Sequence, residues 1–255
     1  MDLKSQRVLV TGGSRGIGAA IARAFARQGA AVAVNYRENR EAAEATVRSC
    51  RQFGGDALPV QADVTDEQEV RRMSEHIFAE WGALDVVINN AFRPYPFDPE
   101  GRKPFSRLEW KDYRDQLEGV LTGVYHVTQS VLPQMQAKKS GSIVNIVTDL
   151  IARPTVPYHE YTTAKSAVVG FTRNLAAEMG AYGIRINCVA PGLVYPTDSS
   201  RHTKESIREA IADQTPLRRI ATPEDVTGPV LFLASDYSRF MTGQILYVDG
   251  GLVMS

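Results

Sequence analysis

Two side chains that can exchange protons stand four residues apart in "YTTAK", where Tyr161 precedes Lys165. If this segment is helical, both side chains lie on one face and can reach the same bound molecule. A free tyrosine phenol has a pKa near ~10, and a neighbouring ammonium group lowers that pKa by favouring the phenolate. A phenol tuned toward neutral pH can act as a general acid or base on a carbonyl or an alcohol. Thr148, thirteen residues before Tyr161, offers a hydroxyl that can orient such a group.

This spacing is weak support on its own, because tyrosine and lysine often stand four residues apart on the surface of ordinary helices. Tyr158 is a second phenol close by, but the residue four positions beyond it is Thr162, so it gains no cationic partner. We expect Tyr158 to pack or to line a pocket. The chemical interpretation therefore depends on what the fold brings to the same place.

A glycine-rich turn near the N-terminus is a candidate nucleotide site. The sequence "VTGGSRGIG" places Gly12, Gly16 and Gly18 between an expected strand and an expected helix. Glycine permits a sharp turn and a close approach to a pyrophosphate, whose charge the helix N-terminus then stabilises. A tight strand–helix connection without a ligand is the alternative interpretation of the same residues.

The end of the second expected strand bears on the choice of dinucleotide. NAD enzymes usually place an acid there to bind the ribose hydroxyls, whereas this chain has Tyr36 followed by Arg37. Arg15 in the glycine turn adds a second guanidinium group, and two such groups can hold a 2′-phosphate. We therefore predict NADP(H) as the cofactor. The competing interpretation makes Glu38 the ribose ligand and leaves both arginines as solvated surface charges.

Seven short runs rich in valine and isoleucine are candidate strands, each bounded by turn-forming residues. Amphipathic segments separate them, one ending at Gly29 and another opening with Thr222 as the expected N-cap and Pro223 in the first turn. This alternation predicts an α/β fold: a single doubly wound, Rossmann-type domain over residues 1–255, with a mostly parallel sheet flanked by helices. The seven runs are 7–11, 30–36, 57–64, 84–91, 141–148, 184–191 and 243–250.

Two stretches break the regular pattern and are expected to form substrate loops. Residues 92–110 contain four prolines, and residues 192–221 are polar. Both follow the carboxyl ends of expected strands, where open α/β sheets bind their ligands. Aromatic side chains in the first loop would favour an apolar part of the substrate, although they could equally pack against one another.

Composition excludes some classes of function. The 29 basic and 29 acidic residues cancel, so nucleic acid and anionic membranes are not expected partners. Cys50 and Cys188 have no metal-like spacing and are expected to be buried thiols in a reducing compartment. The sequence "MDLKSQRVLV" lacks the apolar core of a signal peptide, and no apolar run is long enough to span a membrane. The chain is expected to be cytoplasmic, and no metal constellation is predicted.

Four motifs together resemble the short-chain dehydrogenase/reductase family. They are T-G-x-x-x-G-x-G at 11–18, "NNA" at 89–91, Y-x-x-x-K at 161–165 and "PG" at 191–192, in the family's order over essentially the whole chain. "TGGSRGIG" and the terminal "TGQILYVDGG" are most similar to the 3-oxoacyl-[acyl-carrier-protein] reductase group. The resemblance implies a homotetramer that transfers a hydride between NADP(H) and a carbonyl or secondary alcohol. The expected substrate is a 3-oxoacyl thioester, free or carried on acyl carrier protein; a sugar, steroid-like or xenobiotic alcohol is the alternative.

The resemblance also assigns the site residues. Thr148, Tyr161 and Lys165 become the catalytic residues, and Lys165 is expected to hold the nicotinamide ribose as well. Asp63 and the backbone of Val64 are expected to meet the adenine, although Asp63 could equally cap the end of its strand, and Asn90 and Ala91 are expected to line the adjacent ribose. An oxidised nicotinamide is expected to help Lys165 lower the pKa of Tyr161. The full set of predicted cofactor ligands is Gly12, Ser14, Arg15, Gly16, Ile17, Gly18, Tyr36, Arg37, Asp63, Val64, Asn90, Ala91, Tyr161, Lys165, Pro191, Gly192 and Val194.

Three positions depart from the family pattern. Thr148 stands where serine is usual, Phe92 where glycine is typical, and Val120 where an asparagine commonly links the lysine to solvent through water. Threonine keeps the hydroxyl, but valine cannot bond a water through its side chain, so the proton route must use another group such as backbone or Glu118. These changes keep a different class of function open, a non-catalytic NADP-binding regulatory protein.

Overall fold

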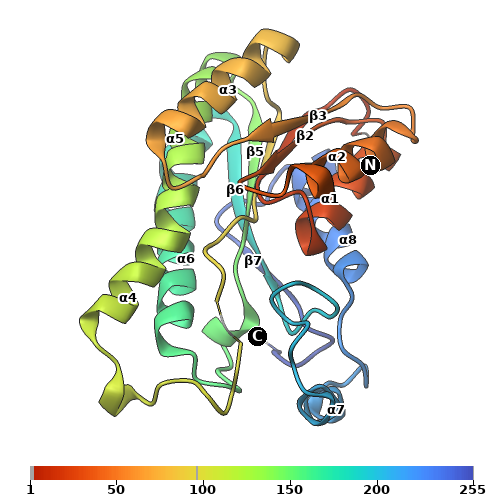
Figure 1. Ribbon diagram of the computed structural model, residues 1–255. Helices are drawn as coiled ribbons and strands as arrows, with labels where there is room; N and C mark the ends of the chain where they lie inside the picture. The colour runs from red at the N-terminus through yellow and green to blue at the C-terminus, as the bar shows by residue number, and fades with distance from the viewer. Residues whose placement is uncertain (1–2, 96, 255) are drawn as a thin grey trace.

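A single parallel sheet of seven strands runs through the centre of the molecule in this computed structural model, which describes residues 3–95 and 97–254 (Figure 1). The strand order is β3-β2-β1-β4-β5-β6-β7, and every neighbouring pair is parallel. The strands are β1 (Arg7–Val10), β2 (Ala31–Tyr36), β3 (Ala57–Gln61), β4 (Val86–Asn89), β5 (Gly141–Ile146), β6 (Ile184–Pro191) and β7 (Ile245–Val248). All seven predicted runs are therefore strands, and the predicted doubly wound fold is confirmed.

Helices cover both faces of the sheet, which explains why its strands are nearly continuous in apolar residues. In β1, Val8 and Val10 pack into the core under α1, α2 and α8, whereas Leu9 packs into the opposite core under α3, α5 and α6. Figure 1 shows these two helix layers on either side of the sheet. The helices are α1 (Gly16–Arg27), α2 (Arg40–Arg51), α3 (Glu67–Trp81), α4 (Trp110–Leu117), α5 (Gly123–Lys138), α6 (His159–Met179), α7 (Glu205–Gln214) and α8 (Pro223–Ala234).

Local signals set the helix ends where the sequence indicated them. Thr222 and Asp225 form a capping box at the start of α8, with Pro223 at the first helical position. Gly29 follows the end of α1 with a φ of 81°. The buried thiols Cys50 and Cys188 are both free, as predicted, and burial raises the pKa of each to about 11.

A π-helical turn, Glu118–Thr122, joins α4 to α5 beside the carboxyl end of the sheet. Val120 lies in this turn with 1% of its surface exposed, packed in a core cluster with Val124 and Val168. Its side chain therefore contributes packing and no hydrogen bond. Isolated π-helical turns of this kind often occur at functional sites.

Both expected substrate loops leave the carboxyl ends of strands, at the lower end of the molecule in Figure 1. The 192–221 stretch, predicted to break the regular pattern because it is polar, contains the helix α7. Lys204, at the start of α7, pairs with Glu100 of the other loop at 2.6 Å, so the two loops touch. Both partners are exposed.

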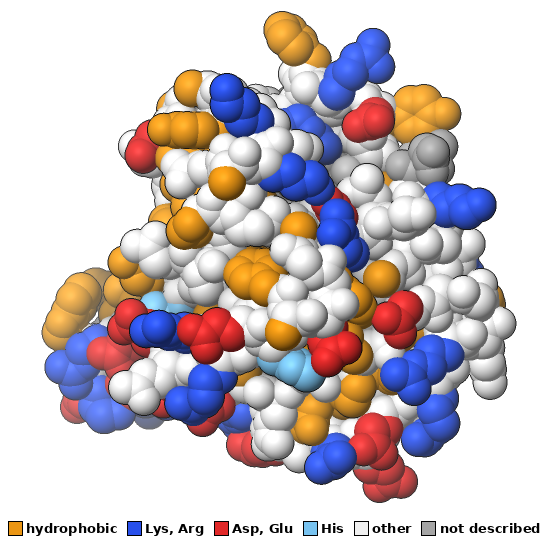
Figure 2. All heavy atoms as spheres, turned by 90° about the horizontal axis from the view of Figure 1, so that it is seen from above, with side chains coloured by type: hydrophobic (Ala, Val, Ile, Leu, Met, Phe, Trp, Pro, Cys, Tyr) orange, Lys and Arg blue, Asp and Glu red, His pale blue; other side chains and the backbone are white. Residues whose placement is uncertain are grey.

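The surface carries mixed charge. On the face in Figure 2, acidic and basic side chains are interspersed among the described residues rather than gathered in patches of one sign. None of the helices within residues 3–95 and 97–254 is long and apolar enough to cross a membrane.

Candidate active site

One cavity of about 1130 Å³ contains every residue predicted from the sequence as catalytic or cofactor-binding. Its lining comes from the segments that follow β1 to β6, at the carboxyl edge of the sheet. The strand order reverses between β1 and β4, and open α/β sheets bind ligands at such a switch point. The sequence-predicted residues on the cavity wall are Gly12, Ser14, Arg15, Gly16, Ile17, Gly18, Tyr36, Arg37, Asp63, Val64, Asn90, Ala91, Thr148, Tyr161, Lys165, Pro191, Gly192 and Val194.

The glycine turn leaves no room for side chains at two of its positions. Gly12 has a φ of 60°, a backbone conformation that favours glycine. A methyl group on Gly18 would lie 2.3 Å from the Gly12 carbonyl oxygen and 2.7 Å from Asn90 Nδ2. The turn is thus folded tightly against the end of β4, and its backbone faces the cavity.

Asn90 and Thr11 hold the glycine turn in place. The Asn90 side chain donates to the carbonyl oxygens of Thr11 (2.9 Å) and Gly12 (3.2 Å). In return, Thr11 Oγ1 accepts from the backbone nitrogens of Asn90 (2.9 Å) and Ala91 (3.0 Å). These bonds explain why β4 ends at Asn89 and not at residue 91. Sequence reasoning assigned Asn90 only to a ribose, and this supporting contact was missed.

Both predicted phosphate-binding arginines contact carboxylates of the protein. Arg15 forms an ion pair with Asp198 of the 192–221 loop, and Arg37 pairs with Glu38 at 2.7 Å and with Asp63 at 3.8 Å. Glu38, the alternative ribose ligand, is therefore also a partner of Arg37.

The position of Asp63 fits both of its predicted roles, that of a cap at the end of its strand and that of a residue facing the cofactor site. Its Oδ1 accepts from Thr65 N (2.9 Å) and Thr65 Oγ1 (2.7 Å), so it does cap the turn after β3, and it also lines the cavity. Burial opposes ionisation of Asp63, but the bonds from Thr65 and the charges of Arg37 and Arg93 together hold the pKa of Asp63 below its usual value.

Tyr161 and Lys165 lie one turn apart on α6, and both are buried against the end of β5. Lys165 Nζ donates to the carbonyl oxygen of Ile146 (2.8 Å) and lies 5.0 Å from the centre of the Phe92 ring. Thr148 follows β5, and its Oγ1 accepts from Leu150 N at 3.4 Å. The three predicted catalytic side chains therefore meet on one wall of the cavity.

The predicted lowering of the Tyr161 pKa relied on Lys165 together with an oxidised nicotinamide, and the groups of the protein alone do not produce it. Burial, the largest influence, and the Asp149 carboxyl raise the pKa of Tyr161 well above its usual value, while the Thr148 hydroxyl acts in the lowering direction as a hydrogen-bond partner. Burial also lowers the pKa of Lys165 to about 8. The ammonium lies 6.0 Å from the centre of the Tyr161 ring and bonds to Ile146, so desolvation outweighs its field.

An aromatic cluster from the 92–110 loop packs over Tyr161. Tyr95 stacks on the Tyr161 ring with centroids 5.1 Å apart, and Phe97 meets it edge-on at 5.0 Å. Tyr158 packs against both, as expected for a phenol without a cationic partner. The aromatic side chains thus pack against one another and also line the cavity.

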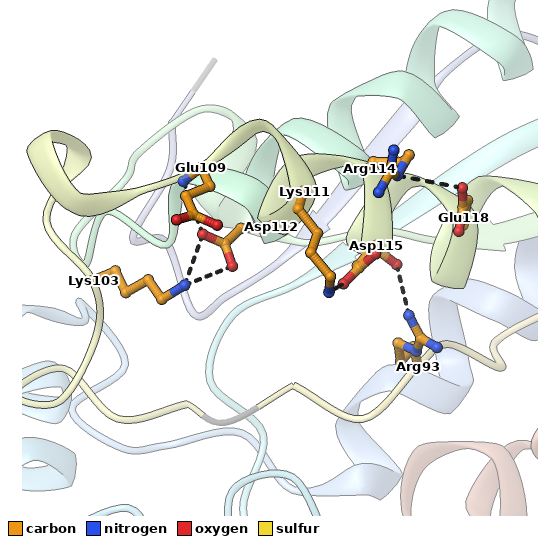
Figure 3. Close-up of polar contacts among 8 residues, drawn as sticks. All are labelled: Arg93, Lys103, Glu109, Lys111, Asp112, Arg114, Asp115 and Glu118. Atoms are coloured by element: carbon orange, nitrogen blue, oxygen red, sulfur yellow. Dashed lines mark hydrogen bonds and ion pairs between the residues drawn. The ribbon is translucent and has the colours of Figure 1, made fainter.

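Charged contacts fasten the ends of this loop to α4, as Figure 3 shows. Arg93 Nη1 donates to the Asp115 carbonyl oxygen (3.3 Å), and Lys103 Nζ bonds to Asp112 Oδ1 (2.7 Å). Phe92 lies just before Arg93, and its ring contacts both Lys165 and Tyr161 on the cavity wall.

Comparison with known proteins assigns the chain to a family. A family model described as enoyl-(acyl carrier protein) reductase matches residues 12–253. The chain is 35% identical over 250 residues to the 3-oxoacyl-[acyl-carrier-protein] reductase FabG of Staphylococcus aureus, covering 98% of this chain and 99% of that protein. The chain belongs to the short-chain dehydrogenase/reductase family.

Other members of the short-chain dehydrogenase/reductase family show the range of the likeness. A probable galactose dehydrogenase of Rhizobium meliloti is 36% identical over 261 residues, covering 98% of this chain and 96% of that protein. The crystal structure of a 3-oxoacyl-[acyl-carrier protein] reductase from Brucella melitensis with bound NAD superposes with a TM-score of 0.88 at 31% identity. It covers 100% of this chain and 93% of that chain. The chain is accordingly an oxidoreductase of a nicotinamide-binding family.

Two residues of this short-chain dehydrogenase/reductase site escaped the sequence analysis. Thr197 lies against Gly16 and lines the cavity, and its place five residues after Gly192 was the available signal. Asp149 directly follows Thr148, so the sequence places an acid beside a predicted catalytic hydroxyl. In the structure Asp149 is only 4% exposed. The burial of Asp149 could not be predicted, because the 3₁₀ turn Asp149–Ile151 that turns it inward has no sequence pattern.

Proposed function

We propose that this short-chain dehydrogenase/reductase is an NADP(H)-dependent reductase of carbonyl compounds, with a 3-oxoacyl thioester as its substrate. The observation that carries the proposal is the meeting of Thr148, Tyr161 and Lys165 on the wall of the cavity that contains the glycine turn. A binding module without catalysis has no use for a buried phenol, hydroxyl and ammonium at one end of such a cavity.

The cavity fits a dinucleotide. The tight glycine turn exposes backbone and the N-terminus of α1, which suit a pyrophosphate. Lys165 would face the nicotinamide end, Asp63 and Val64 the adenine, and Asn90 the ribose next to the adenine. When bound, the reduced dinucleotide would supply the hydride to the carbonyl carbon.

The residues of the chain would handle the proton. Tyr161 is protonated near neutral pH, which is the state that a proton donor needs in reduction. Tyr161 would give its proton to the carbonyl oxygen, and Thr148 would orient that oxygen through its hydroxyl. The aromatic cover from Tyr95 and Phe97 would keep bulk water from the reacting oxygen.

The choice of substrate is open to a direct test. The Staphylococcus aureus relative supports a 3-oxoacyl thioester, and the Rhizobium meliloti relative supports a sugar as the second candidate. We expect NADPH-dependent reduction of acetoacetyl-coenzyme A, with kcat/KM at least ~10-fold above that for oxidation of galactose or cyclic alcohols. Absorbance of the reduced nicotinamide measures both directions. Sugar oxidation as the faster reaction would replace the thioester proposal, and no turnover with any compound would favour the regulatory alternative.

Arg37 should decide the preference for NADP(H). A 2′-phosphate would compete with Glu38 and Asp63 for its guanidinium group, and a bond to a charged group contributes about 1.5–3 kcal/mol. We expect Arg37→Ala to weaken NADPH binding by about 10–100-fold and to leave NADH binding unchanged, as measured by fluorescence titration. Arg40→Ala is the control, because Arg40 is exposed and pairs with Glu44 on α2. Equal losses for NADH and NADPH, or tighter binding of NADH by the unmodified protein, would contradict the NADP(H) proposal.

The remaining parts of the proposal follow the family. We propose a cytoplasmic homotetramer of one domain per chain, in which the loops at 92–110 and 192–221 select the substrate. The half-buried edge strand β7 supports the assembly, because a second copy could cover it.

A further inference from the structure

A buried carboxyl group, that of Asp149, adjoins the proposed catalytic residues but has no part in the reaction described above. Thr148 Oγ1 donates to Asp149 Oδ1 at 3.4 Å, and this same hydroxyl lies close enough to Tyr161 to act on the pKa of its phenol in the lowering direction. Tyr161, Thr148 and Asp149 all line the large cavity. A phenol, a hydroxyl and a carboxyl therefore follow one another along its wall.

A second acid continues this series toward another opening. A methyl group on Gly192 would lie 3.2 Å from Asp149 Oδ2 and 3.1 Å from Asp249 Cβ, so both acids flank Gly192. Asp249 is held by bonds from Gly251 N (3.0 Å) and Val253 N (2.8 Å). It lines a separate cavity of about 140 Å³, which Gly192 also borders. Gly192, which adjoins Asp149, thus borders both the large cavity and the smaller one.

We propose that Asp149 is the proton reservoir of the active site, recharging Tyr161 through the hydroxyl of Thr148. The inference rests on the proposed reductase function. The direct partners of Lys165, the Ile146 carbonyl and the Phe92 ring, offer no proton to the phenolate. Asp149 is the buried acid that reaches it through one hydroxyl.

The proton balance of the relay is simple. After Tyr161 has given its proton to the substrate oxygen, the phenolate takes the proton of Thr148 Oγ1. That oxygen takes the proton of the Asp149 carboxyl, which is left ionised and regains a proton from solvent. A hydroxyl can do this because it donates and accepts at the same time. In alcohol oxidation every transfer runs the other way.

The protonation of Asp149 suits this role. Burial, the largest influence, and Asp249 raise the pKa of Asp149 to about 7, so the group can both hold and release a proton near neutral pH. The titratable groups that face it are Tyr161 from α6 and Asp249 after β7. Arg153, on the same turn, is turned away to the Leu252 carbonyl oxygen (2.8 Å) and Gln214. Reduction needs the protonated carboxyl, so its rate should fall as pH rises through about 7, and oxidation should show the opposite trend.

The test compares Asp149→Asn, Asp149→Glu and Glu118→Gln with the unmodified protein in NADPH-dependent reduction of acetoacetyl-coenzyme A. Glu118 is a matched comparison, because it lines the same cavity and is the other acid considered for a proton route. We expect Asp149→Asn to lower kcat by about 10-fold or more at low pH. The decrease in kcat that the unmodified protein shows as the pH rises through neutrality should be absent in this variant. Asp149→Glu should restore the decrease in kcat with rising pH, and Glu118→Gln should keep the pH dependence of the unmodified protein. NADPH binding should be retained in all three variants.

A second readout does not depend on turnover. Infrared difference spectra of the unmodified protein against Asp149→Asn, followed with pH, should show a carboxyl C=O band that disappears near neutral pH. A profile unchanged in Asp149→Asn, a profile lost in Glu118→Gln, or a carboxyl ionised over the whole range would overturn the relay. Failure of the reductase proposal itself would appear separately, as an absence of NADPH-dependent reduction of acetoacetyl-coenzyme A by the unmodified protein.

Discussion

Tyr161→Phe is expected to bind NADPH as the unmodified protein does and to lose about 10²–10⁴-fold in turnover. The substitution removes one oxygen and keeps the ring, whose contacts with Tyr95, Phe97 and Phe92 hold it in place. The loss should therefore fall on kcat, because the phenol gives its proton in the transition state while the dinucleotide rests on the glycine turn and Lys165. Steady-state kinetics with acetoacetyl-coenzyme A and fluorescence titration with NADPH measure the two quantities.

Tyr158→Phe is the matched control for this experiment. Tyr158 belongs to the same aromatic cluster and is equally buried, but it has no ammonium one turn further along the helix. Its loss of turnover should be smaller than that of Tyr161→Phe by about 10²-fold. Full activity in Tyr161→Phe, or equal losses in the two variants, would refute the assignment of Tyr161 as the proton donor.

Gly18→Ala should have the second largest effect, on both stability and dinucleotide binding. The new methyl group would meet the Gly12 carbonyl oxygen, a backbone atom that cannot move without disturbing its bond from Asn90. Overpacking of this kind costs about 1–3 kcal/mol. The shifted turn should also weaken NADPH binding by at least ~10-fold, because it is the backbone of this turn that faces the cavity. Urea unfolding and fluorescence titration provide the two measurements.

Gly170→Ala provides the comparison, because Gly170 is also a helical glycine but has no atom within 4 Å of the new methyl group. This substitution should stabilise α6 by about 0.5–1 kcal/mol and leave NADPH binding unchanged. If Gly18→Ala behaves like Gly170→Ala, the close packing of the glycine turn is not what shapes the cofactor site.

The sequence predicted the elements whose signals are local. Runs of valine and isoleucine located all seven strands, and Thr222 with Pro223 located the start of α8. Motif spacing selected the cavity-lining residues correctly, because residues at the carboxyl ends of parallel strands converge whatever lies between them.

What could not be predicted depends on contacts between distant segments. The pKa of Tyr161 follows chiefly from its burial, and the rings that pack on it include Tyr95 and Phe97, which lie more than sixty residues away in the sequence. The burial of Asp149 depends likewise on Gly192 and Asp249. The pairing of Arg15 with Asp198 joins segments that share no pattern. Periodicity and motif spacing contain no information about such distances.

The contact between Lys204 and Glu100 has a consequence for how a substrate enters the large cavity. An exposed ion pair of this kind contributes at most about 1 kcal/mol, which is comparable to thermal energy. This ion pair therefore holds the two loops together only weakly. A long acyl chain could enter sideways between them, and added salt, which screens the pair, should ease its passage and leave the buried proton-handling groups undisturbed.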